Sequence, residues 1–207
     1  KGGTYIESAL LSLNRFAWKL CIKANRMAEI VTEERMNRHP FSVFLFNVAG
    51  RDPERYNNLL RLIGYCIYNY KDPSVPAAVI LCDSKISAKS QGGTGKGLLV
   101  KAMSYIRSAV YEDGKAFNRK NATEFRFGRV NHDTDLLHIS DVTKSFDFEA
   151  LFSIITEGFP VRKLYKAEEF IPYEKSPKVI ISTNFSIAGE GSSHERRRVE
   201  FELSDHY

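Results

Sequence analysis

Residues 92–97 read GGTGKG and follow the apolar run AAVILCD at residues 77–83. Closely spaced glycines let successive backbone N–H groups turn toward one anion, and an adjacent lysine can reach terminal phosphates. The run LLVKAM, which follows the loop, predicts a helix whose N-terminus faces the same point. A strand, a glycine-rich loop and a helix in this order predict an α/β fold with a phosphate group at the loop.

The loop departs from the pattern G-x-x-x-x-G-K-[ST] at two positions. Ser90 replaces the first glycine, a position that mainly serves the turn into the loop. Gly97 replaces the Ser or Thr whose hydroxyl ligates magnesium, so a water or Thr94 would have to substitute. A glycine-rich turn with a solvated lysine is the alternative. The candidate nucleotide-binding residues are Gly92, Gly93, Thr94, Gly95, Lys96, Gly97 and Leu98.

Composition narrows the class of protein only slightly. The 207 residues are 43% hydrophobic, and no apolar run approaches the roughly 20 residues of a membrane-spanning helix. The net charge of +5 permits nucleic-acid binding without requiring it. Three widely spaced cysteines argue against a disulfide framework or a thiolate zinc site and fit a reducing cytosol. The chain begins at Lys1 rather than at methionine, which predicts a piece of a longer protein.

The chain divides into two regions by its pattern. Residues 1–75 are predicted to be helical, with helices over 5–31 and 52–70, the second capped by Asp52 and begun by Pro53. Residues 41–50 fit a strand or a buried extended segment, and we leave their assignment open. Two prolines within residues 71–77 favour a boundary there.

Residues 76–207 alternate short apolar runs with helical patterns, which predicts a mostly parallel sheet flanked by helices. The two predicted helices cover residues 97–111 and 147–158, and residues 159–175 resemble a pair of short strands. The strands of the sheet are predicted at residues 77–83, 124–130, 136–142, 178–185 and 197–203.

Two strand ends carry polar groups that a nucleotide site requires. Asp141 ends an apolar strand and could hold magnesium, although a turn aspartate is equally consistent. Asn184 ends the strand after it and could orient water, whereas a Thr-Asn pair in isolation more often forms a turn. Usually a second acid adjoins the first, but Ser140 and Val142 flank Asp141.

Two charged clusters remain ambiguous when read in isolation. Arg196, Arg197 and Arg198 precede the last strand and could stabilise the γ-phosphate of a neighbouring subunit, although a solvated basic run is the more common explanation. The second cluster could ligate a metal, but we discount it because one member lies inside an apolar strand and the others suit a turn. Its members are His132, Asp133, Asp135 and His138.

The order of loop, acidic strand, basic hairpin, Asn-tipped strand and arginines resembles the superfamily 3 helicase core, an AAA+-like P-loop NTPase. The resemblance covers about residues 77–207 and is greatest to primase-helicase proteins of phages and integrated elements, whose loops also read GGTGKG. It implies ATP and Mg²⁺ as cofactors, with Lys96 on the β- and γ-phosphates, Asp141 on the metal and Asn184 on the attacking water. Arg197, with Arg196 or Arg198, would act in trans. Glu157 and Asp135 are the unranked candidates for the general base.

The same resemblance implies a DNA-binding hairpin. Arg162, Lys163 and Lys166 flank Tyr165, which places phosphate-binding charge beside a ring on which a base can stack. A solvated hairpin with a structural tyrosine is the alternative. We therefore expect a homo-oligomeric ring, predicted to be hexameric, that moves single-stranded DNA in the bacterial cytoplasm, with a primase domain possible on the same longer chain. An ATP-binding clamp without turnover, or an ATPase that remodels protein or packages DNA, is the alternative.

Overall fold

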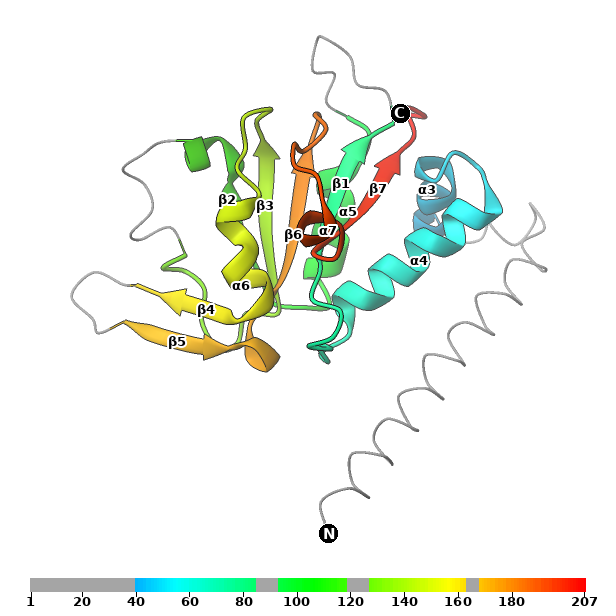
Figure 1. Ribbon diagram of the computed structural model, residues 1–207. Coiled ribbons are helices and arrows are strands. Elements are labelled where there is room, and N and C mark those ends of the chain that lie inside the picture. The colour runs from blue at the N-terminus through cyan, green and yellow to red at the C-terminus, as the bar shows by residue number, and fades with distance from the viewer. Residues whose placement is uncertain (1–39, 85–92, 119–126, 163–167) are drawn as a thin grey trace. The chain divides into compact units, whose positions relative to one another are not determined.

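The computed structural model describes residues 40–84, 93–118, 127–162 and 168–207 (Figure 1). The chain divides into two compact units, Lys1–Arg61 and Leu62–Tyr207, and the division falls within one helix, α4. The helix predicted over residues 5–31 lies outside the described residues. The domain boundary predicted within residues 71–77 stays a prediction.

In the first unit, the segment left open between strand and extended chain is a helix, α3 (Pro40–Val48). Phenylalanines and valines favour strands, but in so short an apolar run they do not separate a strand from a helix. The predicted start of α4 (Pro53–Ile67) is confirmed, because Asp52 Oδ1 accepts the N–H of Arg55 at 2.7 Å.

In the second unit, five strands form one parallel sheet in the order β2-β3-β6-β1-β7, which confirms the predicted fold class. The inner strands are buried almost continuously, as expected of a parallel sheet covered on both faces. The strands are β1 (Ala78–Asp83), β2 (Ala109–Asp113), β3 (Leu136–Val142), β6 (Lys178–Thr183) and β7 (Arg198–Leu203).

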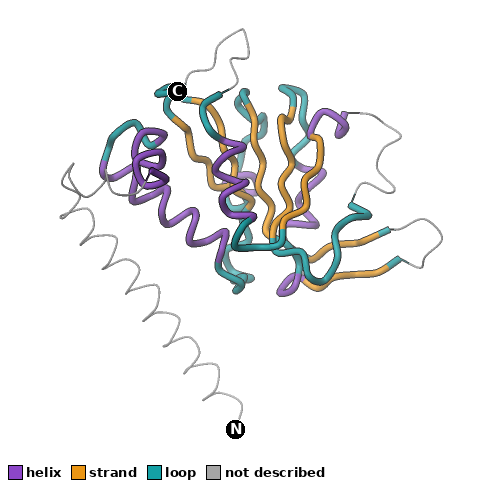
Figure 2. The backbone as a smooth tube through the Cα atoms, turned by 180° about the vertical axis from the view of Figure 1, so that it is seen from behind, coloured by secondary structure: helices purple, strands orange, loops and turns teal. Residues whose placement is uncertain are grey.

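Helices cover both faces of this sheet. Figure 1 shows α6 and α7 in front of the strands, and α5 lies in front of them in the reverse view of Figure 2. The helices are α5 (Lys96–Ser104), α6 (Phe152–Thr156) and α7 (Ser192–Glu195), with 3-10 turns η1 (Gly114–Asn118), η2 (Glu149–Leu151) and η3 (Tyr173–Lys175).

Two predicted elements are wrong. The helix predicted over residues 97–111 ends at Ser104, and its last part is the edge strand β2, which pairs with β3. The strand predicted over residues 124–130 is a turn in its described part, 127–130. Both errors have one cause, because pairing with a distant partner decides which short apolar run becomes a strand.

The predicted pair of short strands is confirmed as an antiparallel hairpin of β4 (Gly158–Val161) and β5 (Glu169–Pro172). Gly158 has φ 139°, and a Cβ there would lie 2.5 Å from the carbonyl oxygen of Ile171. A glycine is therefore required where the hairpin begins. Because η3 joins β5 to the first residue of β6, the base of the hairpin lies at the amino edge of the main sheet (Figure 1).

A buried lysine stabilises the same edge. Lys178 Nζ donates to the carbonyl oxygens of Tyr65 and Tyr68, each at 2.5 Å, and lies 4.3 Å from the centre of the Tyr65 ring. One of these carbonyls lies in the last turn of α4 and the other directly after the helix, where a cation is favourable because the helix leaves carbonyl groups without partners. Burial lowers the pKa of Lys178 to about 8, and the nearby Arg107 adds to the shift.

Candidate nucleotide-binding site

The connectivity of the sheet reverses direction at β1. The chain leaves β1 through α5 and reaches β2 at the far edge, whereas β6 leads through α7 to β7 on the other side of β1. In open α/β sheets, ligands bind outside the carboxyl ends of the strands at such a reversal. The candidate residues are therefore those that follow β1, β3 and β6.

The glycine-rich loop lies at this point and has the backbone that phosphate binding requires. Gly93 and Gly95 have φ angles of 124° and 98°, a left-handed conformation that side chains disfavour. The helix α5 begins directly afterwards at Lys96, and its N-cap residue, Gly95, provides no side-chain hydrogen bond to the first N–H groups. These N–H groups point out of the helix N-terminus, where an anion is favourable. Gly92 lies outside the described residues.

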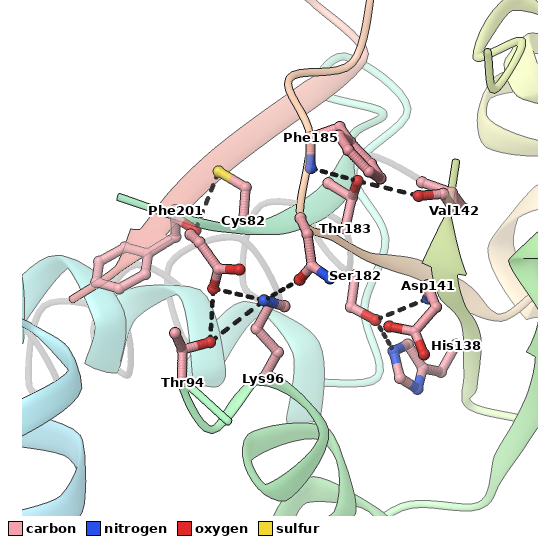
Figure 3. Close-up of polar contacts among 12 residues, drawn as sticks. Cys82, Thr94, Lys96, His138, Asp141, Val142, Ser182, Thr183, Phe185 and Phe201 are labelled. Carbon is pink, nitrogen blue, oxygen red and sulfur yellow. Dashed lines mark hydrogen bonds and ion pairs between the residues drawn. The ribbon is translucent and has the colours of Figure 1, made fainter. Parts of the chain in front are cut away.

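Lys96 is the centre of a buried polar cluster (Figure 3). Its Nζ donates to Asp83 Oδ1 at 2.5 Å, to Asn184 Oδ1 at 2.8 Å and to Thr94 Oγ1 at 3.2 Å. The structure thus brings together three of the residues predicted for the site, from the loop and from the end of β6. The roles predicted for them stay predictions.

Asp83 is the member of this cluster that sequence reasoning missed. It is the last residue of β1, and its Oδ1 also accepts the Thr94 hydroxyl at 2.6 Å. The side chains of Asp83 and Lys96 are 9% and 8% exposed, so the ion pair is largely removed from water. An acid at the carboxyl end of the strand before the loop was the available signal.

Asp141 is exposed at the end of β3, two strands from Asp83 across the sheet. Its φ of 53° is left-handed, and the pairing of β3 with β6 shifts register between Ile139 and Val142. Such a bulge re-aims a side chain at the end of a strand. Ser182 Oγ accepts the Asp141 N–H at 3.4 Å and lies 3.0 Å from His138 Nε2.

The two residues directly after Lys96, Gly97 and Leu98, are open to solvent. A Cβ at Gly97 would meet no atom within 4 Å, and the side chain of Leu98 is half exposed. The position where the usual pattern has a hydroxyl therefore has room for one. Thr94, the alternative source of a hydroxyl, is buried and turned toward Asp83.

The candidates for the general base lie at different places relative to Lys96. Asp135 lies at the amino end of β3, where its Oδ2 accepts the Ser108 N–H at 3.1 Å, so it stands at the edge opposite to Lys96. Glu157 is exposed at the end of α6, immediately before the hairpin. Asp83 is the carboxylate in contact with Lys96.

The discounted histidine and aspartate cluster has other partners. His132 Nε2 lies 2.6 Å from Glu169 Oε1, and His138 lies beside Ser182 in the sheet. Within the described ranges, no group of three or more His, Cys, Asp or Glu side chains is placed to hold a metal ion.

The three arginines lie at the amino edge of the sheet. Arg198 pairs with Ala78 at the start of β1, and Arg197 O accepts the Ala78 N–H at 2.8 Å. Since β1 runs from Ala78 to Asp83, they stand about 17 Å along the strand from the lysine cluster. The Arg197 guanidinium lies 4.6 Å from the centre of the Phe152 ring, and Arg196 is exposed.

The predicted DNA-binding hairpin is described only in part. Arg162 Nε donates to Glu168 Oε2 at 2.9 Å, an exposed ion pair beyond the ends of β4 and β5. Lys163, Tyr165 and Lys166 lie outside the described residues. Phe170 on β5, within the described part of the hairpin, is 58% exposed.

Comparison with solved structures shows the fold. The chain matches the A-form apo structure of the NrS-1 C-terminal region with a TM-score of 0.52 and 20% identity. The match covers 78% of this chain and 36% of the NrS-1 chain. The match to a second structure of that region covers 79% of this chain and 36% of that chain, with a TM-score of 0.51 and 20% identity. The match to a JCV helicase structure covers 95% of this chain and 56% of that chain, with a TM-score of 0.49 and 10% identity. The chain thus spans about a third of the NrS-1 region.

No protein-family model matches the chain, and neither does any curated protein. Among the described residues, no helix is long and apolar enough to cross a membrane.

Proposed function

We propose that this chain is the ATPase core of a superfamily 3-type helicase, which hydrolyses ATP at subunit interfaces of a ring and moves single-stranded DNA. The observation that carries the proposal is the meeting of Lys96 and Asn184 beside the glycine loop, at the carboxyl edge of the sheet. A lysine at the start of a helix and a short amide at a neighbouring strand end suit a phosphate and the water that attacks it.

The residues have distinct roles in this proposal. The loop N–H groups and Lys96 bind the phosphates, and Asn184 orients the attacking water. Asp141 is exposed and is the residue that would hold Mg²⁺, which supplies charge neutralisation on the phosphate oxygens when bound. A single carboxylate suffices for Mg²⁺ when phosphates and waters provide the other ligands.

The arginines favour a ring in this proposal. Arg196 and Arg197 stand about 17 Å along β1 from the lysine cluster, too far to serve the site of their own chain. A neighbouring subunit that presents its amino edge to this carboxyl edge would receive them. The ring size, predicted to be six, and a primase domain on a longer chain belong to the same proposal.

The hairpin provides the DNA contact in the proposal. Arg162 is described, and Lys163, Tyr165 and Lys166 follow it in sequence. Basic side chains that contact phosphates and a ring that stacks on bases bind a single strand without reading its sequence.

The deciding experiment measures ATP turnover at a protein concentration that favours rings, with and without single-stranded DNA. Lys96→Ala should abolish turnover, whereas Lys101→Ala, which removes an exposed lysine from the same helix, should leave it within about twofold. The double variant Lys163→Ala, Lys166→Ala should lose stimulation by DNA. Retained turnover in Lys96→Ala contradicts the site.

An ATP-binding clamp without turnover is the second candidate. Gly97 in place of a metal-ligating hydroxyl, and Asp141 without an adjacent acid, favour it. Binding of ATP without turnover, in a sample shown to be oligomeric and supplied with Mg²⁺, would support the clamp and contradict the motor.

A further inference from the structure

The Lys96 ammonium group uses all of its hydrogen-bonding capacity within the chain. An ammonium has three donors, and they are directed to oxygen atoms of Asp83, Asn184 and Thr94. A phosphate oxygen can reach this nitrogen only by replacing one of the three acceptors.

Asp83 is the acceptor that a phosphate would replace on electrostatic grounds. It is the one anion of the three, and it makes the shortest contact. The pair is buried on both sides, so water screens neither the attraction between the two groups nor the repulsion that Asp83 exerts on an incoming anion.

The same carboxylate oxygen also controls Thr94. Oδ1 of Asp83 accepts the Thr94 hydroxyl and the Lys96 ammonium together, at 2.6 Å and 2.5 Å. Two side chains of the glycine loop are therefore fixed to the end of β1 through one atom.

We propose that Asp83 is an internal counter-ion that competes with nucleotide phosphate for Lys96, and so sets the affinity of the site. This inference rests on the proposed nucleotide-binding function. Occupation of the loop transfers Lys96 from the carboxylate to the phosphate, and the cost of that transfer weakens binding.

The test compares wild type with Asp83→Asn, which keeps the shape and an accepting oxygen but removes the charge. Calorimetry with ATP and with pyrophosphate, both in EDTA, should show affinity about tenfold or more tighter in the variant. The matched control is Asp113→Asn, at the carboxyl end of β2, three strands away at the same edge of the sheet. It should change affinity less than about twofold.

The other outcomes contradict either the counter-ion role of Asp83 or the proposed nucleotide-binding function. Equal or weaker binding by folded Asp83→Asn, while Lys96→Ala abolishes binding, refutes the counter-ion and leaves the nucleotide site intact. Loss of turnover without tighter binding would make Asp83 a group that acts in the reaction, which also refutes it. Absence of binding by wild type refutes the proposed function instead.

A second variant covers a folding defect. Asp83→Ser removes the charge and keeps an oxygen that can accept a hydrogen bond, and it carries the same expectation. If thermal unfolding shows that neither variant folds, the ion pair serves the fold and the proposal fails.

Discussion

His138 on β3 and Ser182 on β6 face each other across neighbouring strands, with the imidazole Nε2 3.0 Å from the hydroxyl oxygen. The same oxygen accepts the backbone N–H of Asp141, so this pair supports the strand end that carries the candidate metal ligand. Burial lowers the pKa of His138 to about 4, against a smaller opposing effect of Asp141. The imidazole is therefore neutral at neutral pH.

Acid should destabilise the protein through His138. Because its folded pKa lies below the unfolded value, the unfolded state binds more protons between about pH 6.5 and pH 4. Its stabilising contribution is complete above pH 6.5 and is lost as the pH falls through 4. The stability difference between wild type and His138→Gln should shrink by about 2–3 kcal/mol from pH 7 to pH 4 in urea denaturation. His132→Gln is the exposed control, and an unchanged difference contradicts the assignment.

Alkaline pH should stabilise the protein through Lys178. Its folded pKa of about 8 lies below that of an unfolded lysine, so between pH 8 and about 10.5 only the unfolded state keeps the proton. Its contribution to the free energy of unfolding should rise with pH across that window. Urea denaturation at pH 7.5 and pH 10 should show a smaller rise for Lys178→Met than for wild type. The exposed Lys175→Met should follow wild type.

Restoring a hydroxyl at position 97 should strengthen metal-dependent binding. A side chain there meets no atom within 4 Å, so Gly97→Ser fits without rearrangement. We expect ATP affinity in the presence of Mg²⁺ to rise by roughly tenfold, since the hydroxyl can ligate the metal. Gly97→Ala is the matched control, because both variants replace a helical glycine with a better helix former but only serine adds a ligand. Equal affinities of the two variants would contradict the prediction.

Gly158 should be among the least replaceable glycines of the described chain. Alanine there would place a Cβ 2.5 Å from the Ile171 carbonyl oxygen at a φ of 139°. We expect Gly158→Ala to cost on the order of 2–4 kcal/mol of stability. Gly64→Ala, inside α4 with open space around it, should instead stabilise by about 0.5–1 kcal/mol. Similar midpoints in urea for the two variants would show that the hairpin tolerates the side chain.

Two central strands could be read from sequence because they are buried on both faces. Residues 78–83 and 178–183 form continuous apolar runs, so local composition alone marked them. Ala109–Asp113 is short and half exposed at the sheet edge. Its identity as a strand comes from pairing with β3, and a local pattern contains no information about a partner 27 residues away.

For the candidate site, the sequence predicted which residues lie at one edge of the sheet but not all of the contacts between them. The loop, Asp141 and Asn184 follow from motif and order, because strand ends of a parallel sheet meet at one edge. Lys96 and Asn184 are hydrogen-bonded although they are 88 positions apart in sequence. The order of the elements indicated that both would lie at the same edge of the sheet. The role of Asp83 depends on side-chain direction within the folded loop, which no spacing encodes.

The separation of Lys96 and Arg197 along β1 has a consequence for mixtures of chains. In the proposed ring, each active interface takes its lysine from one subunit and its arginine from the next. Lys96→Ala and Arg197→Ala chains, each inactive alone, should then recover turnover when mixed, because one interface in each alternating pair combines two intact halves. Complementation of this kind would show that each active site is formed by two subunits, without any structure of the assembled ring.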